Sequence, residues 1–330
     1  MNRRRRILTW HIHGSYLYYL TQANCDFYLP VNADRSNGYG GKSGAYPWGD
    51  NVHEVPVEQV RHLDLDAILF QAPQHYEVDQ YVILSPEQLH LPKLYLEHDP
   101  PRQVPTDTVH LVADSGTVLV HVTDFNRLMW DGKGAPSAMI DHGVVIPPVK
   151  YEGTLKKGVV VINNIKPRGR RLGWDVFEYV RQHVPIDIVG MGAEEIGGID
   201  ALPHDELPQF LAQYRFFFNP IRYTSLGLSI IEAMMVGLPV VGLQTTELVS
   251  VIENGVHGYL SLKPDDLIRH MHKLIEQPKL ARLLGANARR LALERFSIER
   301  FASDWEALFD AVCTGAYPPP FLKAPVEVMA

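Results

Sequence analysis

The residues best suited to chemistry lie between positions 219 and 241, where a loop leads into an apolar helix. Gly227 stands where the loop becomes the helix, and its missing side chain lets a ligand approach the backbone. The first free N–H groups of that helix, together with its dipole, form an anion site suited to a diphosphate. Glu232, about one turn further in, can accept two hydroxyl hydrogen bonds, as a ribose diol offers. Gly237 stops the helix, and Pro239 prevents its resumption.

A basic run follows the strand predicted at 159–162. Lys166, Arg168, Arg170 and Arg171 lie close together in a chain whose formal net charge is −7, so the sign of the charge is inverted locally. Such a cluster suits a dianionic leaving group. The competing interpretation is an ordinary solvated run of charge.

Short apolar runs alternate with amphipathic segments along the chain, the pattern of βα units that form parallel sheets. Strands are predicted at 7–10, 26–31, 67–70, 94–96, 118–122, 159–162, 186–189, 216–218 and 239–241. Helices are predicted between the strands and at 265–276, 279–296 and 298–311. Polar residues such as Gln71 and Glu97-His98-Asp99 follow strands of the first half. Because ligands bind beyond the carboxyl ends of parallel strands, these residues mark its working edge.

The size of the chain predicts two domains. It has 330 residues, of which 46% are hydrophobic and 21% charged, a globular composition. Single cores stop growing near about 250–300 residues. We expect an N-terminal domain at 1–150, a second domain at 151–312 and a tail at 313–330, with Ile146-Pro147-Pro148-Val149 as a stiff connector.

Bulk charge and cysteine content exclude several classes of protein. The negative net charge gives no global attraction for nucleic acid. Cys25 and Cys313 are too few for a disulfide framework or a zinc site, and no apolar run reaches the roughly 18 residues of a spanning helix. We therefore expect a cytoplasmic protein. The arginines at 3–6 leave peripheral contact with anionic lipid at the inner face of the membrane open, beside the simpler interpretation of a solvated tail.

The stretch 224–241 resembles the donor-binding signature of retaining glycosyltransferases of the GT-B fold, family 4 or glycosyl transferases group 1. The family pattern has two glutamates eight positions apart, then Ala-Met and Gly-x-Pro-Val. Glu232-Ala233-Met234 and Gly237-Leu238-Pro239-Val240 match it, and residues 247–260 match the helix and turn that follow. The resemblance covers residues from about 155 to 310. It implies two Rossmann-like, doubly wound parallel-sheet domains facing across a cleft.

The resemblance also implies a set of donor-site residues. Thr224 stands in place of the first signature glutamate, whose carboxylate approaches the donor sugar in the family. Thr224 can hydrogen-bond the sugar but cannot stabilise positive charge. In the family an arginine and a lysine of the basic loop hold the two phosphates, and we favour Lys166 and Arg171 for this role. The other residues expected at the donor are Gly14, Arg168, Gly192, Leu202, Ser225, Leu226, Gly227, Leu228 and Glu232.

The first half of the chain matches the family more weakly. Gly14 matches its glycine turn after the first strand, which admits donor phosphate or acceptor. His98 stands where the family has a histidine near the donor sugar, and with Thr224 it is our candidate catalytic residue. Asp99 and His142 are candidates on the acceptor side. A structural role is the competing interpretation for each histidine.

These features predict a hexosyltransferase-type enzyme that moves a sugar from a nucleoside-diphosphate sugar to an acceptor hydroxyl with retention, in the synthesis of surface polysaccharide or glycoconjugate. No tightly bound cofactor and no metal are expected. The acceptor is a glycan, a lipid-linked molecule or a small molecule. Two alternatives remain open: a non-catalytic partner subunit that binds nucleotide sugar, and a nucleotide-sugar epimerase of the same fold.

Overall fold

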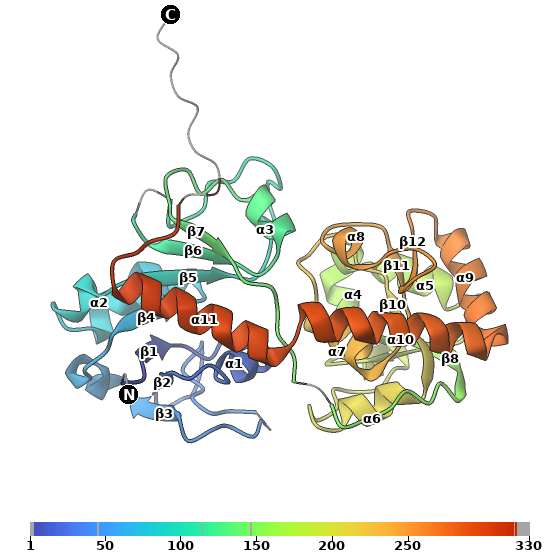
Figure 1. Cartoon of the computed structure of the whole chain (residues 1–330), viewed down its shortest axis with the longest axis horizontal. Helices are drawn as coiled ribbons and strands as arrows, with labels where there is room; N and C mark the ends of the chain where they lie inside the picture. The colour runs from blue at the N-terminus through green and yellow to red at the C-terminus, as the bar shows by residue number, and fades with distance from the viewer. Residues whose placement is uncertain (1–2, 45, 114, 146, 320, 322–330) are drawn as a thin grey trace, which may run out of the picture. The chain divides into compact units, whose positions relative to one another are not determined.

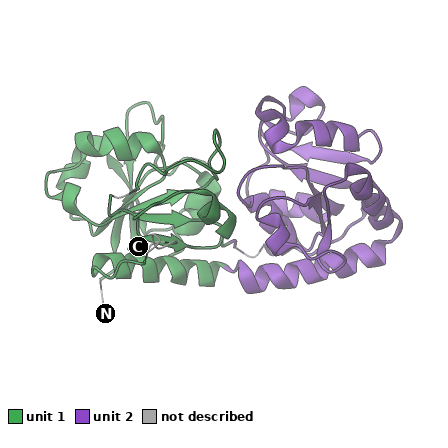
Figure 2. Ribbon diagram, turned by 90° about the horizontal axis from the view of Figure 1, so that it is seen from above, with its two compact units in different colours: residues 1–143, 298–330 green, residues 144–297 purple. Residues whose placement is uncertain are grey.

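The computed structural model describes residues 3–44, 46–113, 115–145, 147–319 and 321. The chain divides into two compact units (Figure 2). Unit 1 comprises residues 1–143 and 298–330, and unit 2 comprises residues 144–297. Each unit is built on one parallel sheet with helices connecting its strands, which confirms the predicted α/β class.

Unit 1 contains a seven-stranded sheet in the order β3-β2-β1-β4-β5-β6-β7 (Figure 1). In that order the strands are β3 (Val52–Pro56), β2 (Asp26–Val31), β1 (Arg6–Thr9), β4 (Ala67–Phe70), β5 (Lys93–Glu97), β6 (Val118–His121) and β7 (Ser137–Met139). The helical elements are α1 (Gly14–Leu20), η1 (Val57–His62), η2 (His75–Asp79), α2 (Gln80–Ile83), η3 (Gln88–His90), α3 (Asp124–Met129) and α11 (Ile298–Cys313). The winding reverses between β1 and β4, which makes their carboxyl ends the expected ligand edge.

Unit 2 contains a five-stranded sheet in the order β12-β11-β10-β8-β9. In that order the strands are β12 (Gly258–Ser261), β11 (Val240–Leu243), β10 (Tyr214–Asn219), β8 (Leu155–Val161) and β9 (Ile186–Val189). The helical elements are α4 (Ile165–Arg168), η4 (Gly169–Leu172), α5 (Trp174–Val180), η5 (Glu194–Ile196), α6 (Leu207–Ala212), α7 (Leu228–Val236), α8 (Leu248–Val251), α9 (Pro264–Glu276) and α10 (Pro278–Arg295). Here the winding reverses between β8 and β10.

Every strand predicted from an apolar run is confirmed, whereas β3, β7 and β12 were not predicted. All three lie at an edge of their sheet. An edge strand has a neighbour on one side only and needs no continuous apolar run, as β3 illustrates, where only Val52 and Val55 are buried. Periodicity alone therefore predicted every central strand and one edge strand, β9, and missed the other three edges.

Helix α11 packs in unit 1, although residues 298–312 were expected in the second domain. Its buried face includes Phe301, Trp305 and Phe309. The Phe301 ring lies 5.5 Å from that of Tyr16, and the Phe309 ring lies 6.4 Å from that of Phe27. An amphipathic helix shows which face it buries but not which sheet receives that face, so the sequence alone did not predict this return to unit 1.

The segment before β1 leaves Arg3 and Arg4 exposed to solvent, as expected from the sequence, and its arginines also pair with carboxylates. Arg3 donates to Asp66 at 2.6 Å, and Arg5 donates to Asp310 of α11 at 2.7 Å. Arg6 begins β1, and its guanidinium contacts Asp64. Within the described residues, no helix has the length and apolarity to cross a bilayer.

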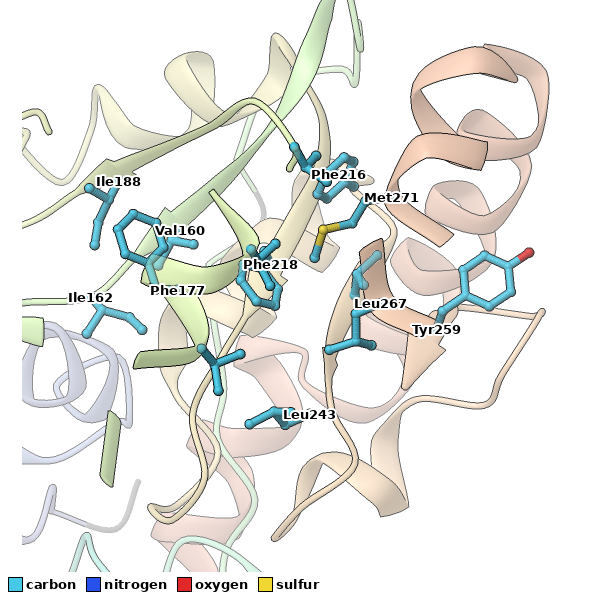
Figure 3. Packing of buried hydrophobic residues seen from close by; sticks show 14 of the residues in the cluster. Val160, Ile162, Phe177, Ile188, Phe216, Phe218, Leu243, Tyr259, Leu267 and Met271 are labelled. Atoms are coloured by element: carbon cyan, nitrogen blue, oxygen red, sulfur yellow. The ribbon is translucent and has the colours of Figure 1, made fainter. Parts of the chain in front are cut away.

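The core of unit 2 is formed between the sheet and helices α5 and α9 (Figure 3). Val160 of β8, Phe216 and Phe218 of β10 and Met271 of α9 are all buried within one cluster. The alternation of Phe216 and Phe218 places both rings on the same face of the sheet. This packing holds β8 and β10 side by side, and the loops that leave their carboxyl ends carry the predicted donor residues.

A buried guanidinium is expected to stabilise unit 2 strongly. Arg215 is 4% exposed. It donates to the carbonyl of Gly153 at 2.9 Å and, at the end of α9, to those of Leu274 at 3.2 Å and Ile275 at 2.6 Å. Arg215→Met leaves these acceptors unsatisfied, so we expect a loss of about 2–4 kcal/mol in the free energy of unfolding. Urea unfolding measures it, with the exposed Arg269→Met as control, and equal stabilities of the two variants contradict the prediction.

Candidate functional site

The two loops of the predicted donor site are in direct contact. The backbone N–H groups of Arg222 and Tyr223 donate to the carbonyl of Arg171 at 3.1 and 3.2 Å. Gly173 has a φ of +78°, and a Cβ there would lie 1.9 Å from the carbonyl oxygen of Pro220. Only glycine permits this approach. The basic loop after β8 and the loop between β10 and α7 therefore form one surface. It lies at the carboxyl ends of β8 and β10, where the winding of the sheet reverses.

The start of α7 has the geometry of an anion site. Its N-cap is Gly227, with a φ of −74° and a ψ of 138°, and the first helical hydrogen bond runs from the Ile230 N–H to the Gly227 carbonyl at 3.1 Å. A Cβ on Gly227 would meet nothing closer than the Ser229 Oγ at 3.7 Å. Since the fold itself accepts a side chain here, the open space beside the N–H groups of Leu228 and Ser229 is available to a ligand.

Asp175 separates the cations of the basic loop into two groups. It accepts from Arg170 at 2.5 Å and from Arg222 through two nitrogens, at 2.5 and 2.8 Å. The Arg222 hydrogen bond is the main reason that the pKa of Asp175 is lowered. Neither Lys166 nor Arg171 has a carboxylate within 4.0 Å among the residues that the structure describes. The two cations favoured from the sequence are thus among those of the basic run that Asp175 does not engage, together with Arg168.

A third loop, which follows β9, lies beside this surface. The two asparagines that hold it in place were not predicted from the sequence. The Asn163 Oδ1 accepts from the Met191 N–H at 2.9 Å, and the Asn164 N–H donates to the Met191 carbonyl at 2.7 Å. Gly192, with a φ of +74°, lies against the Asn164 side chain. The Arg168 guanidinium reaches the Asn163 carbonyl at 3.5 Å. Asn163-Asn164 carries no motif, although a left-handed residue such as Asn164 (φ 53°) is typical of tight turns.

The signature residues surround the start of α7. Ser225 is 9% exposed, and within the described ranges its buried Oγ has no hydrogen-bond partner. Leu226 is buried, and Thr224 is half-buried. Glu232 lies four residues after Leu228, which places both on one face of the helix. Leu202 is half-buried and lies beyond the loop that follows β9.

In unit 1 the candidate His98 is held in one tautomer. The Gln71 side-chain nitrogen donates to the Thr9 Oγ1 at 2.9 Å and to the Trp10 carbonyl at 3.1 Å. The Gln71 Oε1 therefore faces the His98 Nε2, at 3.0 Å. His98 must donate from Nε2, so its Nδ1 carries a lone pair. Burial holds the pKa of His98 well below its usual value, and His13 and His142 lower it further, which keeps the ring neutral.

The three histidines of the working edge gather around Tyr16. The ring centroid of His98 lies 4.2 Å from that of His13 and 4.8 Å from that of Tyr16, and His142 lies 5.6 Å from Tyr16. His142 is buried, and its carbonyl accepts from Arg300 of α11. His142 therefore packs between the sheet and α11. His98, in contrast, lines the pocket described below.

The space beside Gly14 is occupied by the protein itself. A Cβ there would lie 3.0 Å from the Tyr46 ring and 3.2 Å from the His11 Nε2. The Tyr46 hydroxyl also lies 3.1 Å from the Ser15 Oγ, and its ring stacks on that of Tyr18 at 5.6 Å. We expected this glycine to admit a ligand, and in the structure it admits Tyr46.

A pocket of about 650 Å³ opens at the carboxyl ends of β4 and β5. Its lining includes Gln71, His98, Asp99, Val104, Val109 and Trp130. The predicted His98 and Asp99 thus lie in one concavity, whereas His142 is not among its lining residues. Val104, Val109 and Trp130 were not singled out from the sequence, because they lie in a loop and directly after the short helix α3, where there is no motif.

Comparisons with known proteins agree with the architecture of both units. Residues 160–277 match the family described as Glycosyl transferases group 1. N-acetyl-alpha-D-glucosaminyl L-malate synthase of Bacillus anthracis is 28% identical over 107 residues, which are 32% of this chain and 28% of that protein. The match thus spans under a third of the relative's length.

Two solved structures resemble the chain over nearly its whole length. Sucrose-phosphate synthase from Thermosynechococcus elongatus has a TM-score of 0.72 at 13% identity, over 94% of this chain and all of the other. Anabaena HepE in complex with UDP and glucose has a TM-score of 0.70 at 14% identity, with the same coverage. At these identities the likeness shows the fold alone, and that fold is GT-B.

Proposed function

We propose that this chain, which has the GT-B fold and carries a glycosyl transferases group 1 domain over residues 160–277, transfers a glycosyl group from a nucleoside-diphosphate sugar to an acceptor hydroxyl with retention. The observation that carries the proposal is the contact of the basic loop with the loop before α7, through the hydrogen bonds from Arg222 and Tyr223 to Arg171. It joins a cation cluster to a helix N-terminus, as recognition of a diphosphate requires.

Each part of the site has a role in this proposal. Lys166 and Arg171 hold the diphosphate together with the N–H groups at the start of α7, and they stabilise the charge that grows on the leaving group. Glu232 binds the ribose diol. The buried hydroxyl of Ser225 supplies a further hydrogen bond, and Thr224 contacts the donor sugar. HepE, which shares the fold, holds UDP and glucose, so UDP-glucose is the first donor to test.

The acceptor is assigned to unit 1, where His98 and Asp99 line the pocket. The lone pair on the His98 Nδ1 is available to accept a hydrogen bond from a hydroxyl. The likeness to glycosyltransferases favours surface polysaccharide or glycoconjugate synthesis as the setting. A non-catalytic partner subunit is the second candidate function, because Thr224 carries no charge where the family pattern has a glutamate.

A panel of nucleotide sugars separates an enzyme from a binding subunit. We expect release of a nucleoside diphosphate from at least one donor, with the transferred sugar retaining its anomeric configuration. Tight binding of a nucleotide without turnover on any acceptor instead supports the partner subunit. Absence of both nucleotide binding and turnover overturns the proposal.

Glu232→Ala is expected to weaken donor binding by roughly 10- to 100-fold, because loss of a charged hydrogen-bond acceptor costs about 1.5–3 kcal/mol. Titration calorimetry with the nucleoside diphosphate released in the panel measures the effect. Glu294→Ala removes an exposed glutamate of α10 and is the matched control. Unchanged affinity in Glu232→Ala removes this residue from the site.

A further inference from the structure

The charge of the described residues that line the pocket of unit 1 is mainly negative, with the carboxylates of Glu97, Asp99 and Asp107 against one guanidinium. Arg102 is the one lysine or arginine among its lining residues, and it is paired with Asp99. The Glu97 carboxylate accepts from the His110 Nε2 at 3.1 Å and from the Asp99 N–H at 2.9 Å. The His110 Nδ1 accepts from the Val112 N–H at 3.2 Å, which leaves the Nε2 as the donor to Glu97. These polar groups satisfy one another within the protein.

One wall of the same pocket is apolar and open to solvent. Val104 and Val109 line it and are 50% and 47% exposed. Leu111 and Trp130 continue the wall. The Trp130 Nε1 donates to the Asp99 carbonyl at 2.8 Å, and its ring meets that of His110 edge-on at 4.7 Å, so the indole is held in place. A concave apolar wall beside a few oriented polar groups is typical of small-molecule sites.

The pocket combines an apolar wall with charged groups that are paired within the protein. We therefore propose that the acceptor is a small uncharged amphiphile. Its aromatic or alicyclic part lies against Val104 and Val109, and its hydroxyl faces His98. The inference rests on the proposed function and narrows its acceptor class, because it disfavours a lipid-linked phosphate or pyrophosphate, which would need cations in the pocket. A volume of about 650 Å³ lies within the usual range of small-molecule sites.

Three probes that differ in their apolar ring or in charge test this inference, with binding measured without any donor. Phenyl β-D-glucopyranoside is an uncharged amphiphile, methyl β-D-glucopyranoside lacks the apolar ring, and phenyl phosphate adds charge. We expect the phenyl glucoside to bind at least about 10-fold more tightly than either of the others, as burial of one apolar ring predicts. Equal affinities for the two glucosides, or tighter binding of phenyl phosphate, overturn the inference.

Variants of the wall localise the binding. The double variant Val104→Asp, Val109→Asp is expected to abolish the preference for the phenyl glucoside, whereas Val82→Asp, at a valine of the same unit that is 64% exposed and does not line the pocket, keeps it. Matching unfolding midpoints show that the variants are folded. A preference that survives in the double variant overturns the assignment to this pocket.

A parallel titration with UDP separates the two proposals. Nucleotide binding and turnover together with equal glucoside affinities overturn the amphiphilic acceptor alone. A protein that binds no nucleotide and turns over no donor overturns the proposed function, and with it the acceptor inference.

Discussion

Reversing two charges of the basic loop, Lys166→Glu with Arg171→Glu, is expected to lower the affinity for UDP by roughly 100-fold or more, since each charge-assisted hydrogen bond contributes about 1.5–3 kcal/mol. Among the cations of this loop, these two are not engaged by Asp175, which pairs with Arg170 and Arg222. The expected loss is in binding, because the diphosphate contacts exist before the reaction begins. Titration calorimetry at fixed ionic strength measures it.

The control makes the same change of charge near the amino ends of the strands, away from the basic loop. Lys156 lies near the start of β8, and Arg181 follows α5. Lys156→Glu with Arg181→Glu alters the net charge equally, so it reproduces any effect of the overall field. Equal losses of affinity in the two double variants contradict a local diphosphate site. Unfolding midpoints separate weakened binding from loss of structure.

Replacing His98 with alanine is expected to lower kcat by about 100-fold, the lower range for loss of a positioned acid–base or orienting group. The Gln71 hydrogen bond places the proton on the His98 Nε2, so the acting atom is Nδ1. Asparagine places an amide oxygen near the Nδ1 position, whereas glutamine reaches the Nε2 position. His98→Asn is therefore expected to retain more activity than His98→Gln, and the reverse order contradicts the assigned tautomer.

The pH profile provides an independent measurement of the same residue. Burial lowers the pKa of His98 well below its ordinary value, and the neutral ring is the competent form. Activity is thus expected to stay level as the pH falls through the usual histidine range, and to decline only at more acidic pH. In Gln71→Glu, a carboxylate facing the Nε2 favours the protonated ring and moves that decline to higher pH. An unmoved profile shows that Gln71 does not act through His98.

The central strands and the start of α7 were predictable because local rules determine them. A parallel strand buried on both faces needs a continuous apolar run, and residues 67–70 and 118–120 form such runs. Gly227 and Gly237 are the N-cap and the C-cap of α7. The backbone conformation of a helix cap depends on residues close in sequence, so it can be predicted locally. The site at this helix was proposed from the sequence for the same reason.

Contacts between distant residues could not be read in the same way. Asp175 pairs with Arg222 across 47 positions, and this contact engages a cation that would otherwise be available to a ligand. The glycine turn at Gly14 does not predict that the Tyr46 side chain fills the space beside it. The wall of Val104 and Val109 likewise exists only once the loop after β5 folds over the strand ends.

The sequence by itself determined the α/β class, the order of its central strands along the chain and the glycine-started helix, because hydrophobic period and backbone propensity act over a few residues. Tertiary structure alone decided that α11 joins unit 1, that Lys166 and Arg171 remain unengaged by Asp175, and that His98 is held neutral at a pocket. Each of these depends on free energies of burial and pairing between groups far apart in the chain, which no local pattern encodes.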